Sequence, residues 1–296
     1  MRVLILGAAG MLGHKLWQVC RERFETWATV RGASGKYVAY NLFDPERLLD
    51  GVDASDFSTV VRAFDRVQPQ VVVNATGIVK QSPSAKDPIA SIEINSLFPH
   101  RLARLCRAAG VKLVHISTDC VFSGRKGMYK ENDTPDAVDL YGRSKLLGEV
   151  QEPNCLTLRT SLIGREVATA HGLVEWFLSN SGGSVRGYTN AIFSGLPTLV
   201  LSEIIAQIID RHALLSGLYH VSSDPISKYQ LLCLVRDAFH IPIVIERFPE
   251  PSIDRSLDFS QFRTLTGYVP TPWPDMVMAM AADGTPYDSW RHARGS

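Results

Sequence analysis

Short apolar runs alternate with longer stretches of mixed polarity over the first 160 residues of the chain. The apolar runs occupy residues 3–6, 26–30, 71–73, 113–116 and 155–158. Short runs rich in Val, Ile and Leu are typical of strands that a parallel sheet buries on both faces. Between two of these runs, residues 96–109 place Leu97, Leu102, Leu105 and Ala109 at helical spacing. Strands separated by helices predict β-α-β units, and hence an α/β fold built on a doubly wound parallel sheet.

The pattern of apolar and polar positions changes after about Gly164. A loop rich in small residues at 179–184 precedes a predicted helix at 199–212, a strand at 218–221, a helix from Ser227 to about His240, and a strand at 243–246. We therefore divide the chain into a domain of residues 1–164 and a smaller α+β lobe of residues 165–296, some of whose segments return to the main sheet. Six prolines from Pro249 to Pro286 predict a tail that wraps the surface more than it builds a core.

Composition narrows the classes of function. The chain has 296 residues, with 31 Lys and Arg against 30 Asp and Glu, and this balance argues against a nucleic-acid-binding protein. Five scattered cysteines without a C-x-x-C pair are typical of reduced thiols, so we expect a cytoplasmic protein. No window approaches the ~18 uninterrupted apolar residues of a membrane span, so we expect no membrane partner. The histidines show no metal-binding spacing, so we expect no metal ion.

A glycine pattern directly follows the first predicted strand. Gly7, Gly10 and Gly13 are spaced G-x-x-G-x-x-G, and a helix is predicted to begin at about Met11. In such a turn the first glycine permits a tight bend, the second lets backbone amides approach a pyrophosphate, and the third allows the helix to pack closely on the strand. The first helical turn, with Met11 and Leu12, presents its positive end to the anion. We interpret the pattern as a dinucleotide site; the alternative is a purely structural turn.

The residue that ends the second predicted strand indicates which dinucleotide binds. NAD sites usually carry Asp or Glu there to accept a hydrogen bond from the ribose 2′-hydroxyl. This chain carries Arg31, whose guanidinium suits a 2′-phosphate, so NADP is favoured, with NAD or a merely solvated arginine as alternatives. Asp53 lies where a carboxylate could accept a hydrogen bond from the adenine amino group; otherwise it would cap a helix.

Tyr141 and Lys145 are one helical turn apart and therefore share one face of a helix. A tyrosine with a pKa near 10 is a poor proton donor at neutral pH, and a neighbouring cation would lower that pKa. Lys145 could also hold the ribose hydroxyls beside the nicotinamide. Thr118 follows the strand at 113–116 and could polarise a carbonyl oxygen through its hydroxyl. These three residues are the predicted catalytic residues.

Three motifs lie around these residues. They read S-T-D-C-V-F-S-G at 117–124, Y-K-E-N-D at 129–133 and Y-G-R-S-K-L-L-G-E at 141–149. With the glycine turn, they resemble the extended short-chain dehydrogenases/reductases, in particular the dTDP-4-dehydrorhamnose reductases and related nucleotide-sugar 4-ketoreductases. Weaker matches occur at 74–76, 95, 158–161, 217–221, 255–258 and 273.

The resemblance implies an NADP-binding Rossmann domain in residues 1–164 and a mainly substrate-binding lobe in residues 165–296. It also implies an oxidoreductase that reduces C4 of a nucleoside-diphosphate-linked 4-keto-6-deoxy sugar, with Tyr141 as the proton donor. By the same match, Asn95 would support the catalytic helix or a proton-relay water. The backbone of Ala75, Thr76 and Gly77 would line the cofactor groove.

Seven residues are candidates for contact with the substrate: Lys80, Asp119, Cys120, Arg159, Arg186, Asn190 and Arg255. Three of the cations, at positions 80, 159 and 186, are suited to a diphosphate, and Arg255 follows from the C-terminal match. Asp119 and Cys120 lie beside Thr118. Asn190 belongs to segment 187–197, which loosely matches the family's substrate loop.

Two other functions compete with the reductase. A nucleotide-sugar epimerase or dehydratase on the same fold would usually retain NAD, and Arg31 argues against it. A non-catalytic regulatory subunit, similar to that of methionine adenosyltransferase, would need no catalytic residues, and the presence of Thr118, Tyr141 and Lys145 argues against it. We therefore expect a nucleotide sugar as the binding partner, and a homodimer is compatible with this interpretation.

Overall fold

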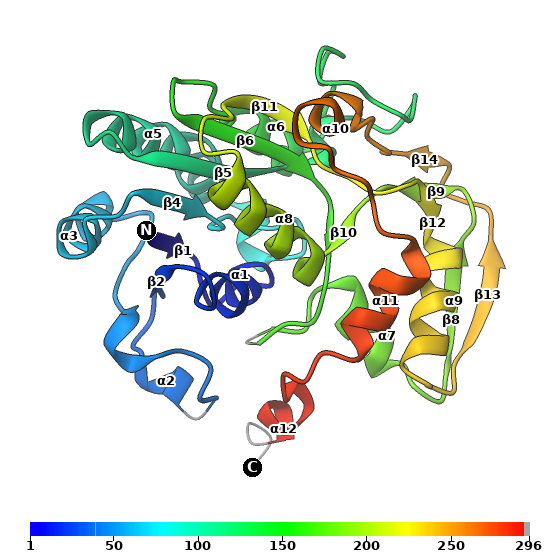
Figure 1. Ribbon diagram of the computed structural model, residues 1–296. Coiled ribbons are helices and arrows are strands. Elements are labelled where there is room, and N and C mark those ends of the chain that lie inside the picture. The colour runs from blue at the N-terminus through cyan, green and yellow to red at the C-terminus, as the bar shows by residue number, and fades with distance from the viewer. Residues whose placement is uncertain (39, 168, 293–296) are drawn as a thin grey trace.

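Seven parallel strands form the main sheet (Figure 1). The structure is a computed structural model that describes residues 1–38, 40–167 and 169–292. The strands are β1 (Arg2–Leu6), β2 (Glu25–Thr29), β3 (Leu48–Leu49), β4 (Val71–Asn74), β5 (Lys112–Thr118), β6 (Cys155–Thr160) and β11 (Gly217–His220). Their order across the sheet is β11-β6-β5-β4-β1-β2-β3, so the direction of winding reverses between β1 and β4. The predicted doubly wound α/β fold is confirmed.

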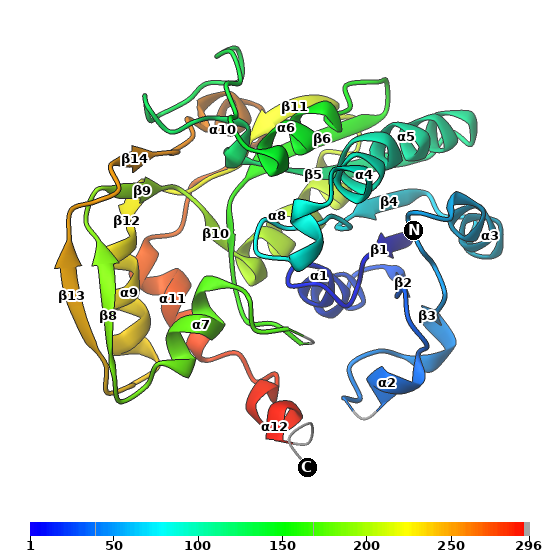
Figure 2. The ribbon, with the colours of Figure 1, turned by 180° about the vertical axis from the view of Figure 1, so that it is seen from behind.

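Alternating side chains build a separate core on each face of this sheet. Val3 and Ile5 of β1 join a buried cluster that includes residues of α1 (Gly13–Cys20) and α8 (Thr198–Arg211). Leu4 and Leu6 join a second cluster, with residues of α3 (Phe57–Val67) and α5 (Phe98–Ala108). Because successive strand residues point to opposite faces, both faces need helices to cover them. Figures 1 and 2 show α8 and α5 on opposite sides of the sheet.

The remaining strands form small sheets beside the main one. They are β7 (Leu162–Ile163) with β10 (Leu196–Pro197); β9 (Ala191–Phe193) with β12 (Ile226–Ser227) and β14 (Ile253–Asp254); and β8 (Ser184–Tyr188) with β13 (Val244–Phe248). The second half of the chain also contains the helices α7 (Leu173–Ser179), α9 (Lys228–Ala238) and α11 (Trp273–Ala281). Helix α9 packs on β8, and α11 packs on α9 (Figure 1). Strand β11, also from the second half of the chain, returns to the main sheet beside β6.

Several short helices and turns connect the longer elements. They are the helices α2 (Gly35–Val38), α4 (Pro88–Ser91), α6 (Leu140–Leu147), α10 (Ser260–Thr266) and α12 (Tyr287–His292), the 3-10 turns η1 (Pro45–Arg47), η2 (Pro83–Lys86) and η4 (Asp119–Val121), and the π-helical segment η3 (Ile92–Leu97). The helix predicted at 96–109 therefore divides between η3 and α5, and the helix predicted from about Met11 begins at Gly13. Among the described helices, none is long and apolar enough to cross a membrane.

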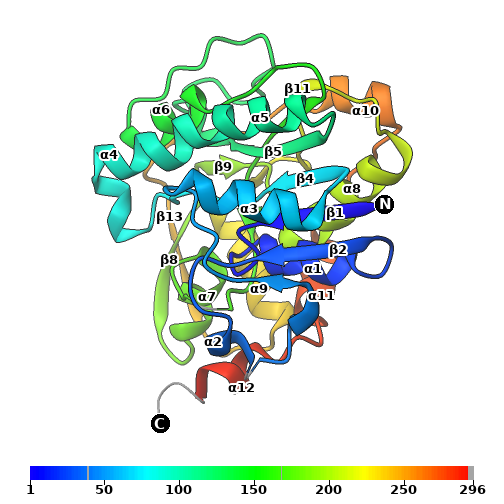
Figure 3. The same ribbon diagram turned by 90° about the vertical axis from the view of Figure 1, so that its left-hand side faces the viewer.

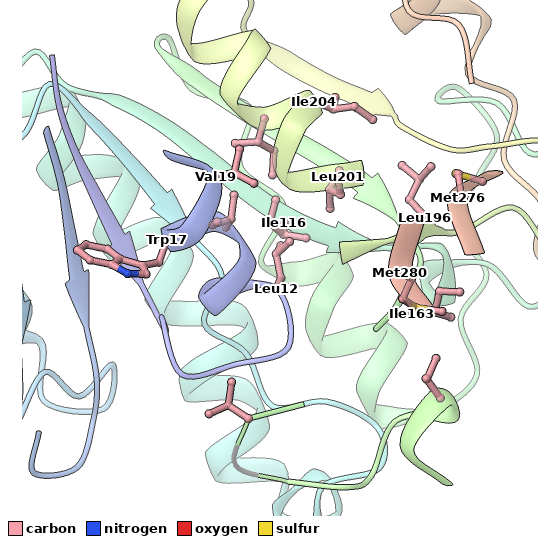
Figure 4. Close-up of a cluster of buried hydrophobic side chains, with 14 of the residues drawn as sticks. Leu12, Trp17, Val19, Ile116, Ile163, Leu196, Leu201, Ile204, Met276 and Met280 are labelled. Atoms are coloured by element: carbon pink, nitrogen blue, oxygen red, sulfur yellow. The ribbon is translucent and has the colours of Figure 1, made fainter. Parts of the chain in front are cut away.

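The proline-containing tail contributes to the core, so the prediction that it mainly wraps the surface is wrong for α11. Trp273, Met276, Val277 and Met280 are all buried in the cluster that covers α1 and α8. Figure 4 shows Met276 and Met280 near Ile163 and Leu196. The prolines at positions 272 and 274 flank the first helical residue, where a missing amide hydrogen costs no helical hydrogen bond. They begin a core helix instead of preventing one.

The C-terminal segment also packs against the glycine-turn helix. The Tyr287 hydroxyl lies 2.6 Å from His14 Nε2, and Lys15 forms an ion pair with Asp283. The ring of Trp290 lies 4.8 Å, between centroids, from the ring of Tyr40. Helix α12 therefore lies near α1 and the segment after α2 (Figure 3).

Candidate active site

The glycine turn connects β1 to α1 and has the close approaches that its spacing predicts. Gly7 has a φ of +81°, and a Cβ there would lie 2.9 Å from Thr76 Oγ1. A Cβ on Gly13 would overlap the Gly7 carbonyl oxygen, so only glycine lets α1 pack this closely. Within the described residues, the amides of Met11 and Leu12 donate no hydrogen bond. They can therefore bind an anion at the start of α1.

A cleft of about 270 Å³ opens near the carboxyl ends of β1, β2 and β4. Its lining includes Arg31, Asp53, Thr76 and Gly77. Asp53 does not cap α3, because Asp56 occupies the cap and accepts a hydrogen bond from the Ser58 amide. Ligands of doubly wound sheets bind at the carboxyl ends of the strands where the strand order reverses. Four of the residues predicted to bind the cofactor therefore line a cleft at the place where folds of this type bind ligands.

Asn95 joins the loop after β4 to the helix that carries Tyr141. Its Oδ1 accepts a hydrogen bond from the Ile78 amide (2.9 Å), and its Nδ2 donates to the Ile78 carbonyl (3.0 Å) and to Ser144 Oγ (3.3 Å). Ser96 Oγ donates a further hydrogen bond to the Ser144 carbonyl (2.8 Å). Asn95 lies in the π-helical segment η3, and wide helical turns of this kind are frequent at functional sites.

Thr118 ends β5, and Tyr141 and Lys145 lie on α6. The cap of α6 is Asp139, whose carboxylate accepts a hydrogen bond from the Gly142 amide (2.8 Å). A Cβ on Gly142 would overlap the Cys120 carbonyl oxygen, so this glycine lets α6 approach the turn after β5. These contacts bring the three predicted catalytic residues together. The Thr118 side chain acts on the Tyr141 phenol, and Lys145 Nζ reaches the carbonyl of Ile116, two residues before Thr118.

Burial sets the protonation of these groups. It raises the pKa of the Tyr141 phenol, and the nearby Thr118 side chain offsets this only in part. The prediction that a neighbouring cation lowers this pKa is therefore wrong for the protein as described. Lys145 Nζ donates instead to the Ile116 carbonyl (2.7 Å), and burial lowers the pKa of Lys145 to about 8. Tyr141 stays protonated at neutral pH, as a proton donor requires.

Two of the residues predicted to bind the diphosphate are paired with carboxylates of the protein instead. The guanidinium of Arg159 forms two hydrogen bonds, each of 2.7 Å, with the carboxylate of Glu149, and both side chains are buried. This ion pair ties the end of α6 to β6, so we assign Arg159 a structural contact. Lys80 donates to the Asp139 carboxylate (2.6 Å), although its side chain is half exposed.

The other candidates divide between two places. Arg186 is exposed on β8, with its guanidinium 4.6 Å from the centroid of the Phe248 ring, and Asn190 is exposed in the turn before β9. Asp119 and Cys120 directly follow Thr118, and Arg255 reaches the end of the same turn by donating from its Nε to the Phe122 carbonyl (2.9 Å). Burial raises the pKa of the Cys120 thiol to about 12, so it carries no thiolate at neutral pH.

The sequence prediction missed one residue of this group, Lys228. It is the first residue of α9 and acts electrostatically on both Asp119 and Cys120. The predicted cap at Ser227 is present, since Ser227 Oγ accepts a hydrogen bond from the Gln230 amide (3.2 Å). The cap placed Lys228 at a helix start, but no local pattern could place that start beside Asp119.

The sheet order, the glycine turn and the grouping of Thr118, Tyr141 and Lys145 define the fold of the extended short-chain dehydrogenases/reductases. Within that class, the chain belongs to the family described as the RmlD substrate binding domain, whose model matches residues 1–285.

Known relatives include proteins with different names. The chain is 28% identical to methionine adenosyltransferase 2 subunit beta of Mus musculus, over 81% of this chain and 73% of that protein. It is 24% identical to dTDP-4-dehydrorhamnose reductase of Aggregatibacter actinomycetemcomitans, over 99% of this chain and 96% of that protein. A solved structure of dTDP-4-dehydrorhamnose reductase from Bacillus anthracis, in complex with NADP, has a TM-score of 0.78 at 22% identity, covering 94% of this chain and 98% of that one. This last likeness shows a shared fold.

Proposed function

We propose that the protein is an NADPH-dependent reductase of nucleoside-diphosphate-linked 4-keto-6-deoxy sugars. The observation that carries this proposal is the partly buried, protonated Tyr141 phenol, which lies close to the Thr118 hydroxyl at the end of β5. A protonated phenol beside a threonine hydroxyl can protonate a carbonyl oxygen as that oxygen gains negative charge. The full-length relative named dTDP-4-dehydrorhamnose reductase supports the choice of substrate class.

The residues of the glycine turn and the cleft fit NADP. A Cβ on Gly7 or Gly13 would collide with neighbouring atoms, so the turn depends on glycine at both positions. The amides of Met11 and Leu12 would bind the pyrophosphate. Arg31 would bind the 2′-phosphate, with Asp53 at the adenine and residues 75–77 along the groove. When bound, NADPH supplies the hydride for reduction of a carbonyl group.

Three side chains would act on the substrate carbonyl and its surroundings. Thr118 Oγ1, which now donates to Asp119 Oδ1 (3.1 Å), would donate to the carbonyl oxygen, and Tyr141 would transfer its proton to the same atom. Lys145 would hold the nicotinamide ribose and, from the same helix face, stabilise the phenolate left on Tyr141. Asn95 would keep α6 in position through its hydrogen bond to Ser144.

The substitution Arg31→Asp should exchange the preference for NADPH over NADH. It removes a charge-assisted contact with the 2′-phosphate and supplies an acceptor for a 2′-hydroxyl, so we expect the ratio of the two affinities to change by about a hundredfold or more. Fluorescence titration with each cofactor measures the ratio. The matched control is Arg21→Asp, an exposed arginine at the other end of α1. Equal titration curves for Arg31→Asp and the parent protein would refute the assignment.

The reductase is tested by a screen for NADPH oxidation with dTDP-, GDP- and UDP-linked 4-keto-6-deoxy sugars. We expect one of these sugars to consume NADPH stoichiometrically and to yield the 4-hydroxy sugar. An epimerase or dehydratase would convert a sugar nucleotide without net consumption of NADPH. That result would contradict the proposed reductase activity and leave the assignment of the fold unchanged.

The second candidate function is a non-catalytic subunit that binds a partner enzyme. It is favoured by the relative named methionine adenosyltransferase 2 subunit beta, which matches most of this chain. The two candidates differ in what they require of Tyr141. A non-catalytic subunit would co-purify with an enzyme in a fixed ratio and would oxidise NADPH with no sugar of the panel. Replacing Tyr141 would leave its binding to that enzyme unchanged.

A further inference from the structure

Two cations of the second lobe lie on either side of β9, near the turn that follows Thr118. The residues before them, Ser227 and Asp254, both pair with Ile192 of β9. Arg255 follows β14, and its Nε donates a hydrogen bond to the Phe122 carbonyl (2.9 Å). Lys228 begins α9, and its ammonium lies 4.0 Å from the centroid of the Phe193 ring. Neither cation forms an ion pair with a carboxylate among the described residues, although both act electrostatically on Asp119.

Arg255 also acts electrostatically on Asp139, but that carboxylate is already paired with Lys80. The remaining side chains, those of Asp119, Lys228 and Arg255, carry more positive than negative charge. Asp119 supplies at most one negative charge, and its carboxylate is buried, which raises its pKa. Lys228 and Arg255 supply two positive charges. A partly buried cation without a paired anion is costly, and proteins retain such charges chiefly where a ligand or partner pairs with them. The surplus positive charge therefore calls for an anionic ligand at the edge of the candidate active site.

The position of the two cations relative to Thr118 and Tyr141 selects the ligand group. Thr118 and Tyr141 come from β5 and α6 of the first domain, whereas Lys228 and Arg255 come from the second lobe. A substrate whose carbonyl oxygen lies at Thr118 and Tyr141 would extend toward the lobe. In a nucleotide-linked neutral sugar, the sugar and base carry no charge near neutral pH, so the diphosphate is its anionic group.

We propose that Lys228 and Arg255 together bind the diphosphate of the substrate, with Asp119 balancing their charge when the site is free. The proposal rests on the proposed function, because that function supplies a nucleotide-linked substrate. Lysine acts here as a compact point charge and arginine as a planar donor, a combination suited to two adjacent phosphates. In this proposal Lys228 and Arg255 make the diphosphate contact. The sequence analysis had favoured other cations for it: Lys80, Arg159 and Arg186.

The test measures binding of dTDP, UDP and GDP by titration calorimetry, with no turnover required. We expect the nucleoside diphosphate that binds best to lose about ten- to hundredfold in affinity in Lys228→Met, because one charge-assisted contact is removed. Lys228→Arg should restore much of the affinity. Affinity for NADPH and the melting temperature should stay near those of the parent protein. Arg255→Lys, which keeps the charge and changes the donor geometry, should give a smaller loss than Lys228→Met.

Two further variants serve as controls within the same lobe. Arg247 lies over the Tyr229 ring (4.9 Å to the centroid) much as Lys228 lies over Phe193, so Arg247→Met removes a comparable cation–aromatic contact and one charge. Arg186→Met removes the cation that the sequence analysis favoured. Both should bind the nucleoside diphosphate like the parent protein. An equal loss in Arg247→Met or Arg186→Met, or an unchanged affinity in Lys228→Met, would overturn the proposal.

The binding test is separate from the test of the proposed function. If no 4-keto sugar is reduced but nucleoside diphosphates bind in a manner that depends on Lys228, the reductase fails and the diphosphate site stands. If none of the three nucleoside diphosphates binds to the parent protein, the diphosphate site fails, whatever the outcome with NADPH.

Discussion

Replacing Tyr141 by Phe should lower turnover with a 4-keto sugar nucleotide by about 10²–10⁴-fold and leave the affinity for NADPH nearly unchanged. Phenylalanine keeps the ring but removes the hydroxyl, which lies near Thr118 and which burial keeps protonated. The carbonyl oxygen would then depend on Thr118 and on water for its proton. Steady-state rates and a fluorescence titration with NADPH measure the two effects separately.

Tyr268→Phe is the matched control for this variant. Tyr268 is another partly buried phenol with a raised pKa, and its hydroxyl donates to the Ser222 carbonyl (3.0 Å), away from Thr118. Its loss should change stability slightly and turnover little. If Tyr141→Phe turned over as fast as the parent protein, Tyr141 would not be the proton donor.

Replacing Arg159 by Met should destabilise the protein by about 3–5 kcal/mol, because it leaves Glu149 buried without its cation. The Arg159 guanidinium also lies 3.3 Å, through Nη1, from His220 Nε2, and its Cζ lies 5.2 Å from the centroid of the Phe122 ring. Burial, and then the charge of Arg159, lower the pKa of His220 to about 4, so His220 is neutral beside the ion pair in the parent protein. Urea unfolding measures the effect.

The double variant Arg159→Met with Glu149→Gln separates the buried charge from the packing. Removing both charges should recover part of the stability, because no unpaired charge is left in the interior. If Arg159→Met instead unfolded at the parent's urea concentration and bound nucleoside diphosphates weakly, Arg159 would be a substrate contact after all.

The first half of the chain could be predicted closely from its residues. The apolar runs at 3–6 and 71–73 correspond to β1 and β4, because strands buried on both faces have little choice of residue type. The G-x-x-G-x-x-G spacing located the turn for the same kind of reason, since the contact of Gly13 with the Gly7 carbonyl excludes any side chain. Tyr141 and Lys145 share a helix face by spacing alone.

Charge partners could not be predicted in the same way. Whether Arg159 meets a substrate or Glu149 depends on the relative placement of β6 and the end of α6, and no local pattern encodes that placement. The same is true of Lys228, whose position near Asp119 depends on the pairing of β12 and β14 with β9. Burial also reversed the expected pKa shift of Tyr141, since a sequence shows a neighbouring cation but not the loss of water.

The central claim is hydride transfer to C4 of a nucleotide-linked 4-keto sugar, and its most direct measurement is the substrate screen run with NADPH deuterated at the transferable position. Product from the parent protein should carry one deuterium at C4, located by NMR and mass spectrometry, with one NADPH oxidised for each product molecule. Product without deuterium at C4, or sugar conversion without oxidation of NADPH, would contradict the claim.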